Sequence, residues 1–180
     1  MLRRLEIRTA LATGLIVALS VAGAATARTE RQPPLVGTWQ RVTTCTELVT
    51  ALRKAGLQKF VLEFVAGNGF IPGVTKPEQI AHPARPCVGA VPRKHSHFFT
   101  KGRAFGSRDW TGQPVDDGTY RLIGRSTVVI AKEFPKVTFH YRIGGRTITF
   151  TPVLPAGCKT FRCAWAISMA YPGKSWTRVR

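Results

Sequence analysis

Hydrophobic and polar residues alternate along most of the chain after residue 94, in short runs that turn residues separate. In the run 137–143 every second residue is apolar, and the Gly-Gly pair that follows suits a two-residue hairpin loop. Such a succession of short runs is typical of a β-sandwich or β-barrel. Strands are predicted over 36–43, 95–100, 104–110, 119–123, 127–130, 137–143, 147–153, 164–171 and 175–179.

The period changes directly after the first predicted strand. In the segment 46–56 apolar residues recur at positions 48, 51, 52 and 55, which is the spacing of an amphipathic helix. Thr44 or Thr46 can cap its start, and Gly56 suits its end. A second short helix is predicted over 58–65, so a helix-turn-helix insert takes the place of a tight turn. Glycines and prolines in 67–92 exclude long elements there and allow one helical turn that begins near Pro77.

Residues 1–27 form a predicted signal peptide. Three arginines precede an apolar run over 10–24, and Ala25-Thr26-Ala27 has the A-x-A pattern of a cleavage site. The apolar run is shorter than the roughly 20 residues that a membrane-spanning helix needs. We therefore expect a flexible leader over 28–34, one domain over 35–180, no transmembrane segment in the mature chain, and a secreted or envelope-associated location.

Four cysteines in an exported chain predict two disulfides, for which three connectivities exist. We favour Cys45–Cys87, because these residues bracket the helical insert. The second pair is then Cys158–Cys163, which we expect at the tip of a hairpin. A cysteine metal site is disfavoured, since no C-x-x-C pair occurs and an oxidising compartment removes thiolates.

The chain is strongly basic, with 27 Lys and Arg, nine Asp and Glu, and a formal net charge of +18. The predicted signal peptide carries three Arg and one Glu, so the mature chain keeps a charge of 18 − 2 = +16. This balance favours an anionic partner, such as a cell-envelope surface. The basic residues are scattered and accompany no nucleic-acid-binding motif, so we expect no specific nucleic-acid partner.

His95-x-His97 is the sharpest local feature. Residues at i and i+2 of a strand point to one face, so both imidazoles could share a metal with a third ligand, His140 or His82. The plainer alternative is an exposed strand start beside basic residues.

No catalytic constellation is recognisable, and we expect neither catalysis nor a cofactor. G-x-S-x-G, H-E-x-x-H and a phosphate-binding glycine loop are all absent from the sequence. Acidic side chains that could do acid–base chemistry are few. Among them, Asp116-Asp117-Gly118 reads as a tight turn and Glu133 as a surface charge between lysines.

A set of mostly aromatic residues is expected to face the interior of the predicted sheet structure. Such residues either fill a small barrel or line a cavity for one small ligand, and the sequence leaves both alternatives open. The candidate ligand-binding residues are Phe99, Phe139, Tyr141, Phe150, Trp165 and Met169.

Gly37-Thr38-Trp39 on the first strand, the helical insert after it, the meander of hairpins and Arg178 on the last strand together resemble the calycins. These are the lipocalins and fatty-acid-binding proteins, and the chain is also similar to uncharacterised secreted bacterial proteins of lipocalin-like type. The resemblance implies a mainly β fold, an antiparallel up-and-down β-barrel of about 8–10 strands with the insert after the first strand. It further implies that Trp39 closes one end of the barrel with Arg178 stacked over it. The second and third lipocalin signatures are not recognisable, and no carboxylate-binding Tyr and Arg pair can be placed.

The leading functional hypothesis is a secreted lipocalin-like barrel that binds a small apolar or amphipathic molecule. The main alternative is a basic, envelope-associated interaction protein with a filled barrel. A histidine-based metal binder and a barrel enzyme are less favoured alternatives.

Overall fold

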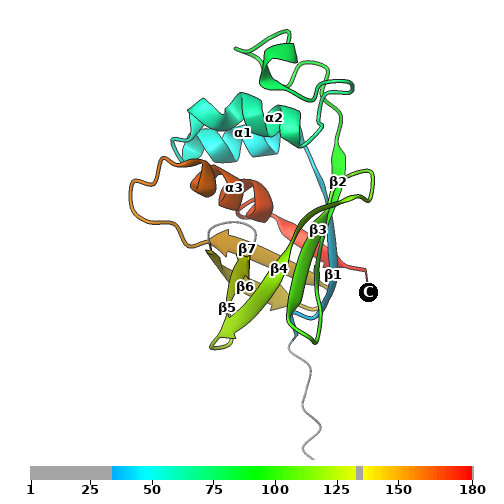
Figure 1. Cartoon of the computed structure of the whole chain (residues 1–180), viewed down its shortest axis with the longest axis vertical. Helices are drawn as coiled ribbons and strands as arrows, with labels where there is room; N and C mark the ends of the chain where they lie inside the picture. Colours follow the sequence, from blue (N-terminus) through cyan, green and yellow to red (C-terminus); the bar gives the residue numbers. More distant parts are fainter. Residues whose placement is uncertain (1–33, 133–135, 180) are drawn as a thin grey trace, which may run out of the picture. The chain divides into compact units, whose positions relative to one another are not determined.

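Eight antiparallel strands form a closed barrel in the computed structural model, which describes residues 34–132 and 136–179 (Figure 1). Each strand pairs with the next along the chain, and the last strand pairs with the first. The predicted mainly β, up-and-down barrel is therefore confirmed. The predicted signal peptide and residues 28–33 of the leader lie outside the described residues. The strands are β1 (Gly37–Thr43), β2 (Arg93–Phe99), β3 (Ala104–Arg108), β4 (Pro114–Ile123), β5 (Thr127–Lys132), β6 (Val137–Gly144), β7 (Thr147–Pro152) and β8 (Ser175–Arg178).

Trp39 on β1 is fully buried, as its place on the inward face of an alternating strand requires. Its indole Nε1 donates a hydrogen bond to the Leu35 carbonyl oxygen at 2.9 Å. Arg178 lies opposite Trp39 in the β1–β8 ladder, and its guanidinium carbon is 4.4 Å from the centroid of the indole ring. The stacked pair that the resemblance implied is therefore present where the barrel closes.

The insert after β1 is helical, as predicted. It contains α1 (Cys45–Lys54), the 3-10 turn η1 (Gln58–Phe60) and α2 (Val61–Gly67), and a further 3-10 turn, η2 (Pro77–Gln79), follows. Thr44 caps α1 through a capping box with Glu47: Glu47 N donates to Thr44 Oγ1 at 3.2 Å, and Thr44 N donates to Glu47 Oε2 at 3.0 Å. Glu47 also pairs with Arg41 of β1 at 2.7 Å, which ties the helix to the barrel wall.

Both predicted disulfides are present, as Cys45–Cys87 and Cys158–Cys163. The first joins the start of α1 to the irregular segment that precedes β2. The second does not lie at a hairpin tip. It links Cys158, which precedes a helix that begins at Phe161, to Cys163 in the first turn of that helix, five positions further on.

The strand predicted over 164–171 is wrong, because this segment lies in the helix α3 (Phe161–Ala170). Large side chains alternate here with Ala and Ser, which resembles the period of a strand. Every residue from Cys163 to Ala170 is buried, so the helix has no polar face that could reveal a period of 3.6. Alanine, the best helix former, occupies three of these positions. The helix ends at Tyr171, which adopts a left-handed conformation with φ 44°.

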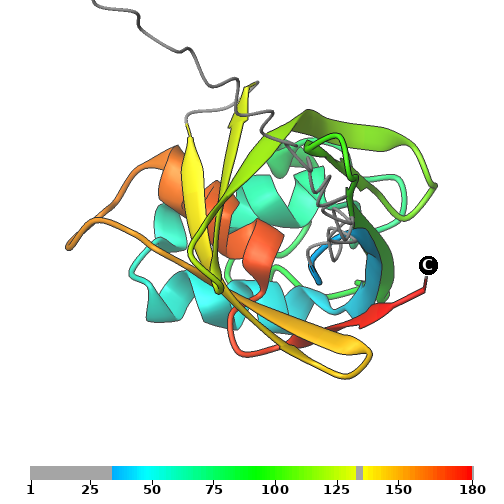
Figure 2. The ribbon, with the colours of Figure 1, turned by 90° about the horizontal axis from the view of Figure 1, so that it is seen from below.

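The helices gather at one end of the barrel, with α3 next to the strands and α1 and α2 beyond it (Figures 1 and 2). Trp176 of β8 donates a hydrogen bond from its indole to the Ala170 carbonyl oxygen at 3.3 Å, which anchors the end of α3 in the barrel. On its other side α3 packs against α2, where the rings of Phe161 and Phe64 are 5.1 Å apart. None of the helices that the structure describes is long and apolar enough to cross a membrane.

Candidate ligand-binding cavity

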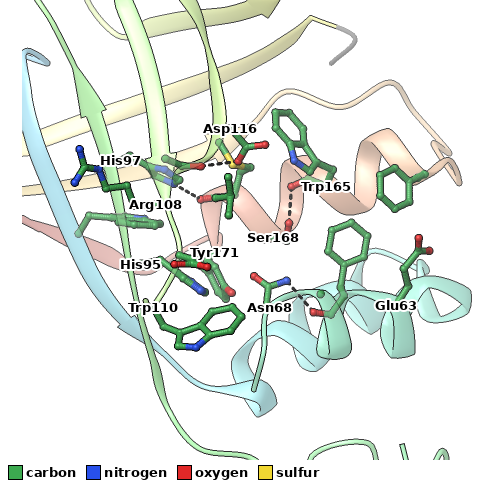
Figure 3. Close-up of a pocket in the computed structure, with 18 residues that line it drawn as sticks. Glu63, Asn68, His95, His97, Arg108, Trp110, Asp116, Trp165, Ser168 and Tyr171 are labelled. Atoms are coloured by element: carbon green, nitrogen blue, oxygen red, sulfur yellow. Dashed lines mark hydrogen bonds between the residues drawn. The ribbon is translucent and has the colours of Figure 1, made fainter. Parts of the chain in front are cut away.

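A cavity of about 300 Å³ lies between the helices and the wall formed by β2, β3 and β4 (Figure 3). It is not the interior of the barrel, although it borders that interior at His97 and Met169. Helix α2 supplies Phe64, and α3 supplies Trp165 and Ser168. Six aromatic rings line it, in addition to two imidazoles: Phe64, Trp110, Phe161, Trp165, Tyr171 and Trp176.

The interior of the barrel itself is almost filled. A small space of about 10 Å³ lies among its inward side chains, roughly what a single water molecule needs. Four of the candidate ligand-binding residues border this small space, namely Phe99, Phe139, Phe150 and Met169. The ring of Phe150 packs on those of Phe99 and Phe139 at centroid distances of 6.1 and 6.2 Å. Tyr141 is buried on the same inward face of β6.

Trp165 and Met169 line the larger cavity, and Met169 borders both spaces. Both side chains reach the cavity from α3. They were predicted as inward residues of a strand, so the prediction rested on the wrong secondary structure. The six predicted residues are thus divided between a filled interior and a cavity beside it.

His95 and His97 lie on the inward face of β2, as the i, i+2 spacing predicted, and both line the cavity. Neither is part of an exposed strand start, because the exposed fractions are 9% and 5%. The ring of His97 is stacked on Trp176 with 4.2 Å between centroids. Its Nε2 is 3.0 Å from the Met169 carbonyl oxygen, an acceptor, so Nε2 carries the proton. Nδ1 then has a lone pair, and it has no hydrogen-bond partner among the described residues.

Burial holds both imidazoles in the neutral form. It lowers the pKa of His97 to about 4, and the hydrogen bond to Met169 only partly opposes this. Burial likewise lowers the pKa of His95 to about 4, where Asp109 opposes the effect and Arg93 adds to it. At neutral pH the two side chains therefore offer polar ring atoms without charge.

His140 does not join them. It lies on the outward face of β6, is exposed, and contacts Thr127 Oγ1 through Nδ1 at 3.0 Å. His82 is likewise exposed, in the irregular segment before β2. Within residues 34–132 and 136–179 no group of three or more His, Cys, Asp or Glu is arranged to hold a metal ion.

Asp116 is a half-buried acidic group of the cavity, and the sequence assigned it to a turn. It lies on β4, which begins at Pro114, and it faces inward as Gly118 and Tyr120 do. Ser107 Oγ of β3 donates a hydrogen bond to Asp116 Oδ2 at 2.6 Å. Burial raises the pKa of Asp116, and hydrogen bonds from Ser107 and Trp165 oppose this. If the alternation of inward and outward residues is extended back from Tyr120 along β4, Asp116 falls on the inward face, so the sequence could have predicted this position.

The helices contribute polar atoms that are already engaged. Ser168 Oγ donates to the Trp165 carbonyl oxygen at 2.8 Å, and Asn68 Nδ2 donates to the Phe64 carbonyl oxygen at 2.8 Å. Trp110 closes the side next to α2, where its ring lies over Gly69 so closely that any side chain at that position would collide with it. The arrangement is suited to holding a molecule with an apolar body and a few polar atoms.

Comparison of the chain with protein-family models, with curated proteins and with solved structures finds no match. The class of protein is therefore defined by the fold and the cavity alone. It is a closed, eight-stranded antiparallel barrel with helices over one end, compatible with a calycin-like arrangement, and with a cavity beneath the helices.

Proposed function

We propose that this protein is a secreted, lipocalin-like binding protein that holds a small amphipathic molecule between its helices and its barrel wall, without catalysis. The observation that carries the proposal is the cavity of about 300 Å³ with its six aromatic rings and its few buried polar groups. A volume of about 300 Å³ lies at the lower end of the range of roughly 300–1,000 Å³ that small-molecule sites occupy, so the cavity suits a small ligand.

Secretion is supported by the two disulfides and by the predicted signal peptide. The filled barrel interior supports a site beside the barrel and disfavours a long fatty chain along its axis.

A second candidate function is attachment to an anionic envelope surface. The filled interior and the net charge of +18 favour it, because a packed barrel with a basic surface needs no ligand to fulfil such a role. Salt-sensitive binding to an anionic polymer, without a small-molecule ligand, would identify it.

The test is native mass spectrometry of protein purified from the medium of the cells that make it. We expect a co-purifying small molecule that Ser168→Phe abolishes, because a phenyl ring at this position occupies the cavity. Ser175→Phe, on an exposed position of β8, is the matched control and should retain the molecule. Spectra without a bound molecule, or with one that Ser168→Phe leaves in place, would refute the proposal.

A further inference from the structure

The charge of the cavity is opposite to that of the chain. Among its described lining residues are the three acidic residues Glu63, Asp109 and Asp116 but a single basic one, Arg108, in a chain with nine acidic and 27 basic residues. With neutral histidines the lining carries a formal charge of 1 − 3 = −2. Arg108 is exposed, and its guanidinium lies 5.8 Å from the ring of Phe98 on the outer face of the barrel.

Asp116 is half-buried and has no cationic partner among the described residues. Both ion pairs found in the described residues belong to Glu47, with Arg41 and with Lys174. In a chain with three basic residues for each acidic one, an unpaired carboxylate in a cavity is unexpected, because removing a charge from water without an opposite charge costs free energy. A carboxylate has about four acceptor positions, so Asp116 can accept further hydrogen bonds beside those of Ser107 and Trp165.

The polar groups around Asp116 are short of donors. Ser107 directs its hydroxyl proton to Asp116, Ser168 directs its own to the Trp165 carbonyl, and His97 uses Nε2–H on the Met169 carbonyl. What remains at these groups is lone pairs, including the buried and unpartnered Nδ1 of His97. Such a site is complementary to a ligand that donates hydrogen bonds.

The aromatic rings suit the same ligand. A cation over the face of Trp or Tyr is attracted by the negative face of the ring, more strongly where water is excluded. Rings at the border of the cavity already contact cations: Arg93 lies 5.1 Å from the ring centroid of Trp110, and Arg41 lies 5.7 Å from that of Tyr171. Neither arginine lines the cavity.

We infer that the ligand is a small organic cation, a primary ammonium on an aromatic or otherwise apolar body, whose charge pairs with Asp116. The inference rests on the proposed function, since it assigns a chemical class to the ligand of the same cavity. It excludes a free carboxylic acid of the same size, whose negative charge would meet Asp116 with no basic group beside it.

The test compares three probes of nearly equal size by isothermal titration calorimetry at pH 7: 2-phenylethylammonium, neutral 2-phenylethanol and phenylacetate. We expect the cation to bind at least tenfold more tightly than the alcohol, and the anion to produce no heat. Asp116→Asn should weaken binding of the cation at least tenfold and change binding of the alcohol less than twofold. Asp117→Asn is the matched control, because Asp117 is the next residue on β4 and is exposed.

Two results would overturn the inference and leave the proposed function intact. One is equal binding of cation and alcohol, and the other is binding of the anion; both use the unmodified protein and do not depend on how Asp116→Asn folds. A cation preference that Asp116→Asn leaves unchanged, with thermal unfolding showing that the variant is folded, would overturn the pairing with Asp116. Absence of heat with all three probes would overturn the inference and the proposed function together.

Discussion

Acid should weaken the folded state through His97, and His97→Gln should remove much of that effect. Burial lowers the pKa of His97 from 6.5 to about 4. Between these values the unfolded chain binds a proton that the folded protein does not bind. The stability contributed by the neutral imidazole is therefore complete above about pH 6.5 and is lost as the pH falls toward 4. Since one pKa unit corresponds to about 1.4 kcal/mol, the loss reaches roughly 2.5 kcal/mol by pH 4.5.

The assay is urea unfolding at pH 7 and at pH 4.5, followed by tryptophan fluorescence. Wild type should lose more stability between these pH values than His97→Gln, with a difference of about 2.5 kcal/mol. Glutamine does not titrate, but its side-chain amide can still donate a hydrogen bond to the Met169 carbonyl oxygen. The substitution therefore removes the titratable group and can keep the hydrogen bond. Effects of other groups, including the opposite effect of Asp116, are common to both proteins and cancel in the comparison.

His140→Gln is the matched control, because this imidazole is exposed to water in the folded protein as it is in the unfolded chain. It should show the same loss of stability as wild type. If His97→Gln and wild type lost equal stability between pH 7 and pH 4.5, the argument that His97 is buried in its neutral form would be refuted.

The disulfides and the closing strand give two further predictions. Replacement of Cys45–Cys87 by alanines should lower the free energy of unfolding by about 4 kcal/mol and replacement of Cys158–Cys163 by about 2, because the sequence separations are 42 and 5. Equal losses in denaturant unfolding would contradict this dependence on loop length. Arg178→Gln should cost about 1 kcal/mol, since the guanidinium covers the ring of Trp39 and also bonds the Pro34 carbonyl. An unchanged melting temperature would show that the stacked pair contributes no stability.

The barrel could be predicted from the sequence because each of its strands has one buried face. Alternation placed Phe139, Tyr141 and Phe150 on the inside, and the structure has all three buried. The insert could also be predicted, since α1 has both an apolar and a polar face and carries its own capping residue, Thr44. In these segments the local pattern and the tertiary environment agree.

The cavity could not be predicted, because it depends on an element whose pattern is misleading. Helix α3 is buried on all sides, and a helix of this kind has no amphipathic period to detect. If residues 164–171 are predicted as a strand, Trp165 and Met169 are assigned to the barrel interior. Helix α3 is then missing from the predicted fold, and so is the cavity between α3, α2 and the barrel wall. Asp116 was missed for a related reason. Its Asp-Asp-Gly sequence is typical of turns, but β4 extends through it as a ten-residue strand.

The distribution of buried polar side chains agrees with the proposal that the cavity binds a ligand. Six polar or charged side chains are buried in the described residues, and four of them line the cavity: His95, His97, Ser107 and Ser168. If the space between helices and barrel were purely structural, apolar side chains would fill it at a lower cost in free energy than polar ones. The barrel interior is filled in this way by Phe99, Phe139 and Phe150. The same chain thus packs one space almost completely and leaves the other open, polar and acidic. Since both spaces share His97 and Met169, a general failure of packing does not explain the difference, whereas the proposed recognition of a ligand would account for it.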